Sequence, residues 1–364
     1  MGQPMVVRRV LLNAKVPVNA TCLRPIVARL AGDPRLDLRL TSRWRGNRWA
    51  PGRLTRALPE SHAALRRVRT VPAPLAGLRR FDLYLSPDMV PTGARRAARK
   101  IHLFHGVSFK GASISPKALV YDHLFLFGEY QRRRFVEKRI VEDGDPRLEV
   151  IGWPKLDCLV DGSLDRDAIR RDLSLSGDRP VVLYAPTWRG TSLDADGEAI
   201  VDALAGLDVD LIIKLHDHSL DPGLARRSWD EQMAGWAGRS NVAVWSDPDV
   251  CPALMAADLL VSDFSSVANE FALLDRPTVF FDTPDLTVRY SAKQIDHAML
   301  ARRGELGLVV DRPEALREAV TQALEHPTEH SAARQALARD LFHEPGTATD
   351  RAVKRILEIL GLSD

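Results

Sequence analysis

Short apolar runs alternate with helical patterns along most of this chain, and that alternation restricts the possible folds more than any other feature. Runs of about four to eight apolar residues between amphipathic segments are typical of βαβ units and a parallel sheet. Two blocks are visible. The first holds expected strands at 8–15, 36–42, 81–88, 100–106, 122–128 and 147–153, and the second holds those at 180–188, 210–216, 241–247, 259–263, 277–282 and 306–311.

Two such blocks in 364 residues agree with the usual domain size of roughly 150 residues. We expect an α/β fold of the GT-B type, with two Rossmann-like domains facing a central cleft, because open parallel sheets bind ligands at the carboxyl ends of their strands. The N-terminal domain should cover 1–160 and the nucleotide-binding domain 161–345. Residues 346–364 are expected to form a helix, opened by Pro345 and a nearby cap residue, that packs back on the first domain.

Charge is distributed very unevenly along the chain. Residues 1–150 carry a formal charge of +17 and the remainder −14, which together give the net +3. The basic half indicates an anionic partner such as a membrane surface, a phosphate polymer or nucleic acid, although frequent arginine usage alone is the alternative. Within 41–70, arginines flank tryptophans in a mixture that suits an anionic membrane, with nucleic-acid binding or an ordinary loop as alternatives; the candidate residues are Trp44, Arg45, Arg48 and Trp49.

The three cysteines are far apart and follow no metal-ligand spacing, which fits a reducing compartment. The first twenty residues resemble a strand more than a signal peptide, and no apolar run approaches the ~18 residues of a membrane span. We therefore expect a cytosolic or peripheral protein. Neither a metal site nor a covalently bound cofactor is predicted, and any need for Mg²⁺ stays open.

The sharpest local pattern is LLVSDFSSVANEFALLDRP, where a buried strand ends at Asp263 and a helix begins at Ser265 or Ser266. Free N–H groups at a helix start, together with two hydroxyls, can bind a pyrophosphate. An ordinary N-cap explains one of the serines equally well.

A second pattern is KIHLFHGVSFKG, in which His105 ends an apolar run. An imidazole at that place can accept the proton of an incoming hydroxyl, and Lys110 can hold a phosphate. A structural histidine is the alternative reading.

Two further strands end in polar residues. Lys214, His216 and His218 follow one, and they can surround a phosphate; zinc binding by this group is a weaker alternative because no other ligands are near. Thr187 and Arg189 follow the other, where the arginine can bind phosphate oxygens, while the neighbouring tryptophan can stack or simply pack.

Taken in order, HGVSFKG, IGWPKLD, YAPTWRG, KLH and VSDFSSVANEFALLDRP resemble the CDP-glycerol glycerophosphotransferase family of teichoic-acid and capsule synthesis, over about 100–285. The resemblance implies attack of an acceptor hydroxyl on the β-phosphorus of CDP-glycerol, with CMP as the leaving group. His105 then corresponds to the catalytic base, with Lys110 nearby, and His216 to a group at the donor phosphates beside Lys214. The further pyrophosphate contacts implied are Arg189, Ser265 and Ser266, with Asp263 orienting their turn.

Some positions depart from the family pattern. Val107 and Ser108 replace a usual Thr-Pro, Asp217 replaces the proline after KLH and makes His218 a rival for the phosphate role, and Lys155 replaces arginine. The class of donor is therefore better supported than the identity of its polyol, which can be glycerol or ribitol, and better than the identity of the acceptor.

The resemblance also implies a lipid-linked or anionic polymer acceptor at the cytoplasmic membrane face, and with it a cytoplasmic protein that is peripheral on the inner face of the cell membrane. Two other functions stay open: a nucleotide-sugar glycosyltransferase or epimerase on the same fold, and a non-catalytic binder of nucleotide or polymer.

Overall fold

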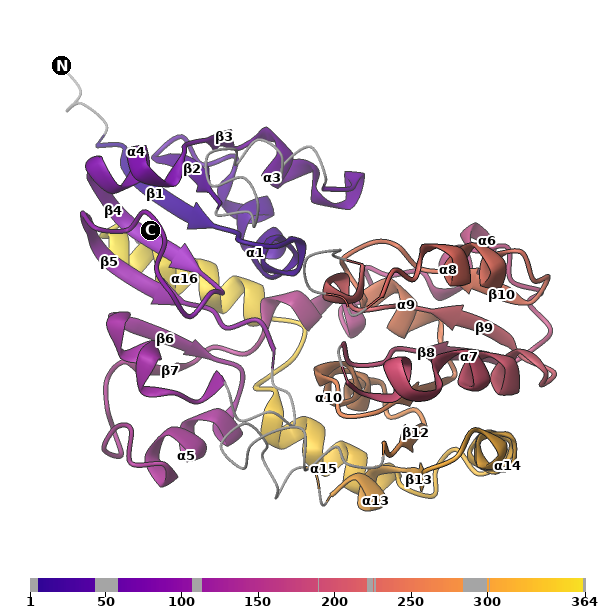
Figure 1. Ribbon diagram of the computed structural model, residues 1–364. Helices are drawn as coiled ribbons and strands as arrows, with labels where there is room; N and C mark the ends of the chain where they lie inside the picture. Colours follow the sequence, from indigo (N-terminus) through magenta and orange to yellow (C-terminus); the bar gives the residue numbers. More distant parts are fainter. Residues whose placement is uncertain are drawn as a thin grey trace. The chain divides into compact units, whose positions relative to one another are not determined.

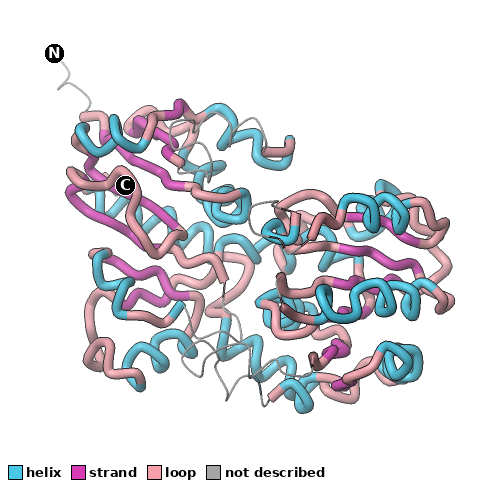
Figure 2. The backbone as a smooth tube through the Cα atoms, viewed as in Figure 1, coloured by secondary structure: helices cyan, strands magenta, loops and turns pink. Residues whose placement is uncertain are grey.

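The computed structural model describes residues 6–42, 58–106, 113–188, 190–220, 225, 227–283, 300 and 302–362, and it divides into two compact units (Figure 1). Unit 1 contains the described residues up to 106, together with 113–157 and the chain from 340 onward. Unit 2 contains 158–339. In each unit a layer of strands is packed against helices (Figure 2). An α/β fold with two parallel sheets is therefore confirmed.

Unit 1 is built on a seven-stranded sheet in the order β3-β2-β1-β4-β5-β6-β7, in which every neighbouring pair is parallel. Its strands are β1 Arg8–Asn13, β2 Leu36–Thr41, β3 Arg69–Thr70, β4 Phe81–Ser86, β5 Ala97–His102, β6 His123–Leu126 and β7 Leu148–Val150. Its helices are α1 Pro17–Leu30, α3 Ala63–Arg67, α4 Ala73–Leu78, α5 Glu129–Glu137 and α16 Ala348–Leu360. The short strand β3 has no signal in the sequence.

Unit 2 repeats the arrangement with a six-stranded parallel sheet in the order β10-β9-β8-β11-β12-β13. Its strands are β8 Val181–Tyr184, β9 Asp210–Ile213, β10 Val242–Val244, β11 Leu259–Ser262, β12 Thr278–Phe281 and β13 Leu308–Val310. Its helices are α6 Arg166–Asp172, α7 Ser192–Ala205, α8 Asp230–Ala237, α9 Cys251–Ala256, α10 Ser266–Phe271, α13 Arg303–Leu306 and α14 Pro313–Glu325, and α15 Ser331–Leu341 leads back to unit 1.

Both sheets have a doubly wound order, so each has a point where the connections reverse direction. This point lies between β1 and β4 in unit 1 and between β8 and β11 in unit 2. The central strands are covered by helices and are mostly apolar; all four residues of β8, β9 and β11 are buried. Polar side chains are therefore concentrated where these strands end.

The last helix, α16, belongs to the core of unit 1. Ala352, Ile356 and Leu360 recur every four residues, and they join buried side chains of β1, α1 and β4. The helix begins at Ala348 rather than next to Pro345, and the side chain of its N-cap residue Thr347 makes no capping hydrogen bond. The cap of this helix comes instead from elsewhere in the unit.

That cap is the Asp157 carboxylate of the GWPKLD motif. It accepts hydrogen bonds from the backbone N–H groups of Gly346 at 2.9 Å, Ala348 at 3.1 Å and Thr349 at 2.7 Å. These N–H groups have no acceptor within the helix, so a buried carboxylate stabilises them and interacts favourably with the helix dipole. This motif residue therefore holds α16 to unit 1.

Candidate active site

The carboxylate of Asp263 connects three segments at the reversal point of unit 2. It is fully buried and accepts hydrogen bonds from the backbone N–H of Thr187 at 2.9 Å, the Thr187 hydroxyl at 2.5 Å and the Ser192 hydroxyl at 2.9 Å. The loop after β8, the start of α7 and the turn after β11 are thereby fixed together. Asp263 acts on the geometry of the site, and buried Thr187 is one of its partners.

Next to the hydrogen bonds of Asp263, the half-buried rings of Trp188, His216 and His218 lie at the ends of β8 and β9. The Trp188 indole meets the His218 imidazole edge-on, with ring centres 4.7 Å apart. The centres of the Trp188 and His216 rings are 6.0 Å apart. The two imidazole centres are 5.0 Å apart. Residues that the sequence placed on two separate strands are therefore adjacent in space.

One hydrogen bond sets the tautomer of His216. Its Nδ1 accepts from the backbone N–H of His218 at 3.0 Å. A backbone N–H can only donate, so Nδ1 is unprotonated and the neutral ring carries its proton on Nε2. His216 is thereby prepared as a hydrogen-bond donor, which is the role that an anionic oxygen requires.

Lys214 is almost buried, and its amine is bound within its own turn. The Nζ donates to the Leu215 carbonyl at 2.8 Å and to Asp217 Oδ1 at 3.1 Å. Asp217, where the family pattern has proline, thus pairs with this lysine. The amine therefore helps to fix the turn that carries His216 and His218.

Ser265 is the N-cap of α10, and its hydroxyl accepts from the Val267 N–H at 3.4 Å. Ser266 is the first residue of the helix and is half-buried. Capping thus accounts for Ser265, while both serines lie directly after Asp263, at the same edge of the sheet.

In unit 1, His105 follows the carboxyl end of β5 and is exposed. Its Nδ1 lies 2.9 Å from the carbonyl oxygen of Pro87, just beyond β4. A carbonyl can only accept, so Nδ1 carries the proton and the lone pair of the neutral ring is on Nε2. His105 is thereby prepared as a proton acceptor, the opposite of His216.

The backbone that presents His105 is strained. Phe104, immediately before it, has a φ of 56° although its aromatic side chain is fully packed. A bulky residue in the left-handed region costs roughly 1–3 kcal/mol and persists only where its surroundings impose it. Contacts of the Phe104 ring with His102, Phe127 and Phe135 impose it here.

The turn that receives the His105 bond, residues 86–88, is held from several sides. The Ser86 carbonyl accepts from His102 Nδ1 at 3.0 Å, and the Asp88 carbonyl accepts from the Tyr121 hydroxyl at 2.5 Å. The His102 ring stacks on Tyr121 with centres 4.7 Å apart. Burial lowers the pKa of His102 to about 3, so its ring is neutral. None of these residues was predicted from the sequence; the available signal was that Ser86 and His102 end two strands of the same sheet.

Several predicted residues lie outside the described part of the chain. They are Lys110, Arg189 and the proposed membrane residues Trp44, Arg45, Arg48 and Trp49. Among the residues described, no group of three or more His, Cys, Asp or Glu side chains is arranged to hold a metal ion.

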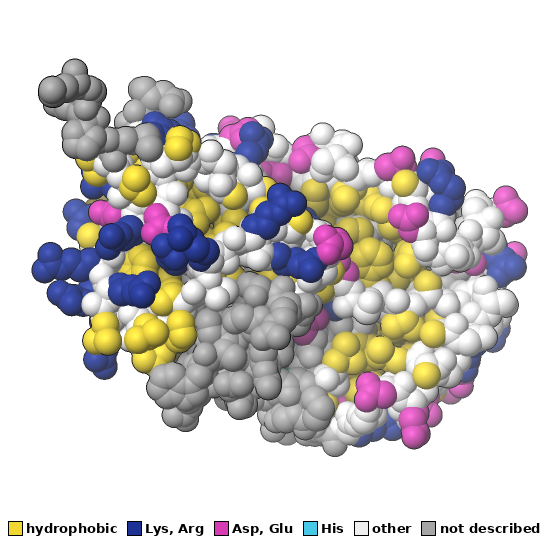
Figure 3. All heavy atoms as spheres, turned by 90° about the horizontal axis from the view of Figure 1, so that it is seen from above, with side chains coloured by type: hydrophobic (Ala, Val, Ile, Leu, Met, Phe, Trp, Pro, Cys, Tyr) yellow, Lys and Arg dark blue, Asp and Glu magenta, His cyan; other side chains and the backbone are white. Residues whose placement is uncertain are grey.

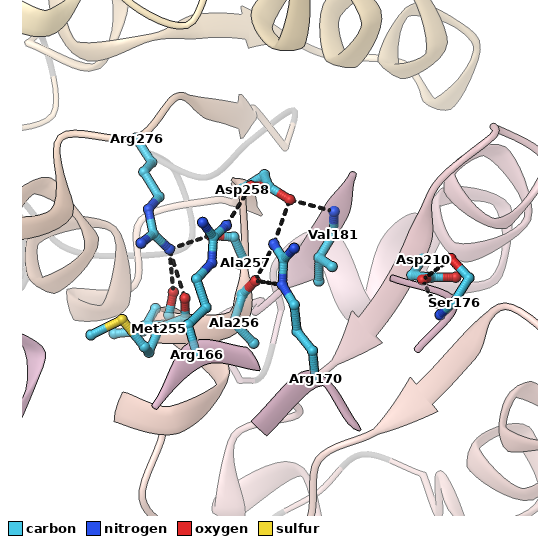
Figure 4. A network of polar contacts seen from close by, with 11 residues as sticks. Arg166, Arg170, Ser176, Val181, Asp210, Met255, Ala256, Ala257, Asp258 and Arg276 are labelled. Carbon is cyan, nitrogen blue, oxygen red and sulfur yellow. Dashed lines mark hydrogen bonds and ion pairs between the residues drawn. The ribbon is translucent and has the colours of Figure 1, made fainter. Parts of the chain in front are cut away.

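The opposite edge of the unit 2 sheet contains a group of arginines with a different role (Figure 4). Arg170 donates to the Ala256 carbonyl at 2.8 Å and Arg276 to that of Met255 at 2.7 Å, both at the end of α9. Arg166 and Arg170 also bind the Asp258 carboxylate. Burial and the neighbouring Arg166 lower the pKa of Arg276 to about 10. These guanidinium groups satisfy terminal helix carbonyls, so this end of the VSDFSS…LLDRP motif is structural.

Comparison with known proteins identifies the family of the chain. Residues 101–358 match the family model described as CDP-glycerol:poly(glycerophosphate) glycerophosphotransferase. The match covers well over half of the chain and includes the residues around both histidines.

Two curated relatives are teichoic-acid enzymes of staphylococci. The teichoic acid poly(glycerol phosphate) polymerase of Staphylococcus epidermidis is 31% identical over 147 residues, which is 38% of this chain and 19% of the relative. The teichoic acid glycerol-phosphate transferase of Staphylococcus aureus is 27% identical over 229 residues, or 60% of this chain and 54% of the relative. The aligned region thus spans between about a fifth and about half of these relatives.

Solved structures extend the likeness in fold to nearly the whole chain. The wall teichoic acid polymerase TagF superposes with a TM-score of 0.66 at 18% identity, covering 97% of this chain and 89% of that one. A UDP-GlcNAc 2-epimerase from Neisseria meningitidis, solved with UDP-GlcNAc, gives 0.59 at 14% identity over 96% and 100%. These neighbours show a GT-B-like fold, which polymer-forming and sugar-nucleotide enzymes share.

Proposed function

Because the chain belongs to the CDP-glycerol:poly(glycerophosphate) glycerophosphotransferase family, we propose that it transfers glycerol phosphate, or a related polyol phosphate, from a CDP-linked donor to an acceptor hydroxyl. CMP is released, and the acceptor is a lipid-linked or polymeric molecule of teichoic-acid or capsule-type synthesis. The names of the two staphylococcal relatives support this reaction, and a TagF variant was solved after soaking with CDPG.

The single observation that carries the proposal is the pair of opposite histidine tautomers. The Nδ1–H of His105 is bound to the Pro87 carbonyl, so Nε2 can take a proton. Nδ1 of His216 is occupied by a backbone N–H, so Nε2 carries a proton that it can donate. Transfer to a hydroxyl needs both functions, one at the nucleophile and one at the phosphates.

In the proposed reaction the acceptor oxygen attacks the β-phosphorus of the donor. A new P–O bond forms, the P–O bond to CMP breaks, and the hydroxyl proton moves to His105 Nε2. His216 donates to a phosphate oxygen on which charge accumulates, beside His218 and Trp188. Thr187, Lys214 and Asp263 hold the loops that carry these groups, and Ser265 and Ser266 lie at the same edge.

We assign the acceptor to unit 1, because His105 lies there. We assign the nucleotide donor to unit 2, because the rings of Trp188, His216 and His218 lie there. We also place the reaction at an anionic membrane surface, on the inner face, because residues 1–150 carry a charge of +17. Within the described residues, no helix is both long and apolar enough to cross a bilayer.

The test is CMP release from CDP-glycerol in the presence of a glycerol-phosphate acceptor analogue. We expect His105→Ala to lower kcat about 10²–10⁴-fold with donor affinity unchanged, since the base acts on the acceptor proton. His216→Ala should weaken donor binding in calorimetry. His326→Ala, which removes an exposed histidine of α14's end, is the matched control and should change neither quantity.

Other results would favour other functions. If a UDP-sugar binds in place of every CDP-polyol, the chain is a glycosyltransferase or an epimerase, as the UDP-GlcNAc 2-epimerase neighbour illustrates. If CDP-glycerol binds but no acceptor releases CMP, and His105→Ala is without effect on any readout, the chain is a binding protein.

A further inference from the structure

The turn that follows β9 is closed by an ion pair. Lys214 Nζ lies 3.1 Å from Asp217 Oδ1, and the amine also donates to the Leu215 carbonyl at 2.8 Å. The side chain of Lys214 is 8% exposed and that of Asp217 25%, so salt and water screen this pair only weakly. The second carboxylate oxygen, Oδ2, is buried and has no hydrogen-bond partner in the described part of the chain. The pair therefore holds residues 214–217 together from within the turn.

The residues that come next fix the tautomer of His216. Asp217–Ser219 is a short 3₁₀ helix, and His216 is its N-cap residue. The backbone N–H of His218 donates to His216 Nδ1 at 3.0 Å, and that of Ser219 donates to the His216 carbonyl at 2.7 Å. The first of these bonds places the proton of the neutral ring on Nε2. Both bonds require the backbone of 216–219 to keep its bent course, so the tautomer depends on what holds Asp217 in place.

A proline can hold the same turn without any charge. Asp217 is the first residue of the 3₁₀ helix, where proline is favoured because the N–H at that position has no acceptor within the helix. His216 has a φ of −65° and a ψ of 139°, in the extended region that a proline imposes on the residue before it. Asp217 stands where the family pattern has proline. This chain therefore uses an ion pair where a rigid residue fits equally well.

We propose that Asp217, through its ion pair with Lys214, is a positioning residue that sets the tautomer of His216 and thereby the affinity for the donor. The part about the donor rests on the proposed function. Without the carboxylate, a nearly buried amine loses its counter-charge, and the turn has to open to hydrate it. His218 follows Asp217 directly and moves with the turn, so its N–H no longer occupies His216 Nδ1. The neutral His216 ring then samples both tautomers, and Nε2 is no longer always a donor.

An exposed ion pair next to the same strand provides the matched control. Charged side chains lie over the surface of the protein (Figure 3), and ion pairs between exposed side chains contribute little to structure. Arg179 and Asp208 form such a pair at 3.2 Å, and the Asp208 side chain is 94% exposed. Asp208 precedes β9, and Asp217 follows it. The substitution Asp208→Asn therefore repeats the chemical change of Asp217→Asn at the other end of one strand, where no turn depends on it.

The tautomer is measured on the full-length protein carrying ¹⁵N-labelled histidine, by long-range proton–nitrogen NMR at pH 8, where histidine side chains are ordinarily neutral. The spectrum separates protonated from unprotonated ring nitrogens, and His216→Gln identifies the signals of His216. We expect an unprotonated Nδ1 in the unmodified protein and in Asp208→Asn. In Asp217→Asn both nitrogens should give averaged signals, and Asp217→Pro should restore the unprotonated Nδ1.

Calorimetry with CDP-glycerol on the same variants tests the effect on the donor. The Kd of Asp217→Asn should rise roughly tenfold or more, which corresponds to the loss of one hydrogen bond to a charged phosphate. Asp217→Pro should bring the Kd back to within about threefold of the unmodified protein, and Asp208→Asn should not change it. Lys214→Met/Asp217→Pro removes both charges and leaves no unpaired amine. It should also keep the tautomer, and it decides the question if Asp217→Asn does not fold.

Two results overturn the inference: an unprotonated His216 Nδ1 that persists in Asp217→Asn, or loss of that state in both proline variants. The second result means that the charge of Asp217 is needed for itself and that holding the turn is not its role. Because the NMR measurement uses no substrate, it is independent of the proposed function. If the tautomers are as expected and no form of the protein binds CDP-glycerol, the positioning role stands and the proposed function fails.

Discussion

Single residues in unit 1 illustrate how a buried neutral histidine supports the turn that binds an exposed one. His102 donates from Nδ1 to the Ser86 carbonyl, one residue before the carbonyl that binds His105. Its other nitrogen, Nε2, is buried and has no hydrogen-bond partner within the described chain. Protonation would place a charge in this apolar stack, so the native structure strongly favours the neutral ring.

This arrangement predicts a loss of stability in acid. Burial lowers the pKa of His102 to about 3, against an ordinary value near 6.5. The contribution of neutral His102 to the free energy of unfolding is fully present above pH 6.5. It decreases as the pH falls towards 3, because the unfolded chain then binds a proton that the native state does not. The decrease is at most ~1.4 kcal/mol per pH unit.

Urea unfolding of the protein and of His102→Asn at pH 7, 6 and 5 measures this contribution. The asparagine keeps a donor for Ser86 but does not titrate, so its stability should fall less steeply with decreasing pH. His326→Asn at an exposed position should follow the unmodified protein. Parallel curves for the protein and His102→Asn would contradict the assignment.

At the level of elements, capping decides how the last helix is attached. Asp157 holds three N–H groups at the start of α16, and Gly152 lets the same segment approach closely. Gly152 has a φ of 90°, and a Cβ there would lie 2.5 Å from the His343 carbonyl oxygen. Two residues of the GWPKLD motif thus serve packing, and neither needs to touch substrate.

We expect Asp157→Ala to lower the free energy of unfolding by about 2–3 kcal/mol, because three N–H groups, two of them buried, lose their acceptor. Asp165→Ala is the matched control: Asp165 caps the exposed start of α6 through one bond to the Ala168 N–H at 3.0 Å, so its loss should cost about 1 kcal/mol. Chemical denaturation gives both values, and hydrogen exchange should show faster opening of α16 only in Asp157→Ala. Equal costs in the two variants would refute the special role of Asp157.

For the whole molecule, the order of segments along the chain makes unit 1 depend on its last residues. The chain leaves unit 1 after 157, forms unit 2, and returns within α15. Ala352, Ile356 and Leu360 then complete the core of the first unit. Unit 2 is formed by one nearly continuous stretch, so the two units differ in their sensitivity to truncation.

A chain ending after Arg339 should therefore lose the folded structure of unit 1 while unit 2 remains protected. Burial of each large apolar side chain contributes roughly 1.5–3 kcal/mol to stability. Helix α16 buries several such side chains, so their combined contribution is comparable to the 5–15 kcal/mol stability of a typical domain. Hydrogen exchange followed by mass spectrometry resolves the two units. A chain ending after Leu362 is the control, and undiminished protection of β1 and β4 in the shorter chain would disprove the dependence.

The sequence by itself determined the α/β class, the two blocks of strands and the residues at strand ends, because periodicity and N-capping are local properties of the chain. A helix cap at Ser265 or Ser266 follows from their neighbours alone, and the structure assigns it to Ser265. The tertiary structure decided which strands lie side by side, and with them the tautomer of His105 and the long-range cap that Asp157 provides for α16. Each of these joins segments separated by many residues, and local patterns carry no information about such contacts.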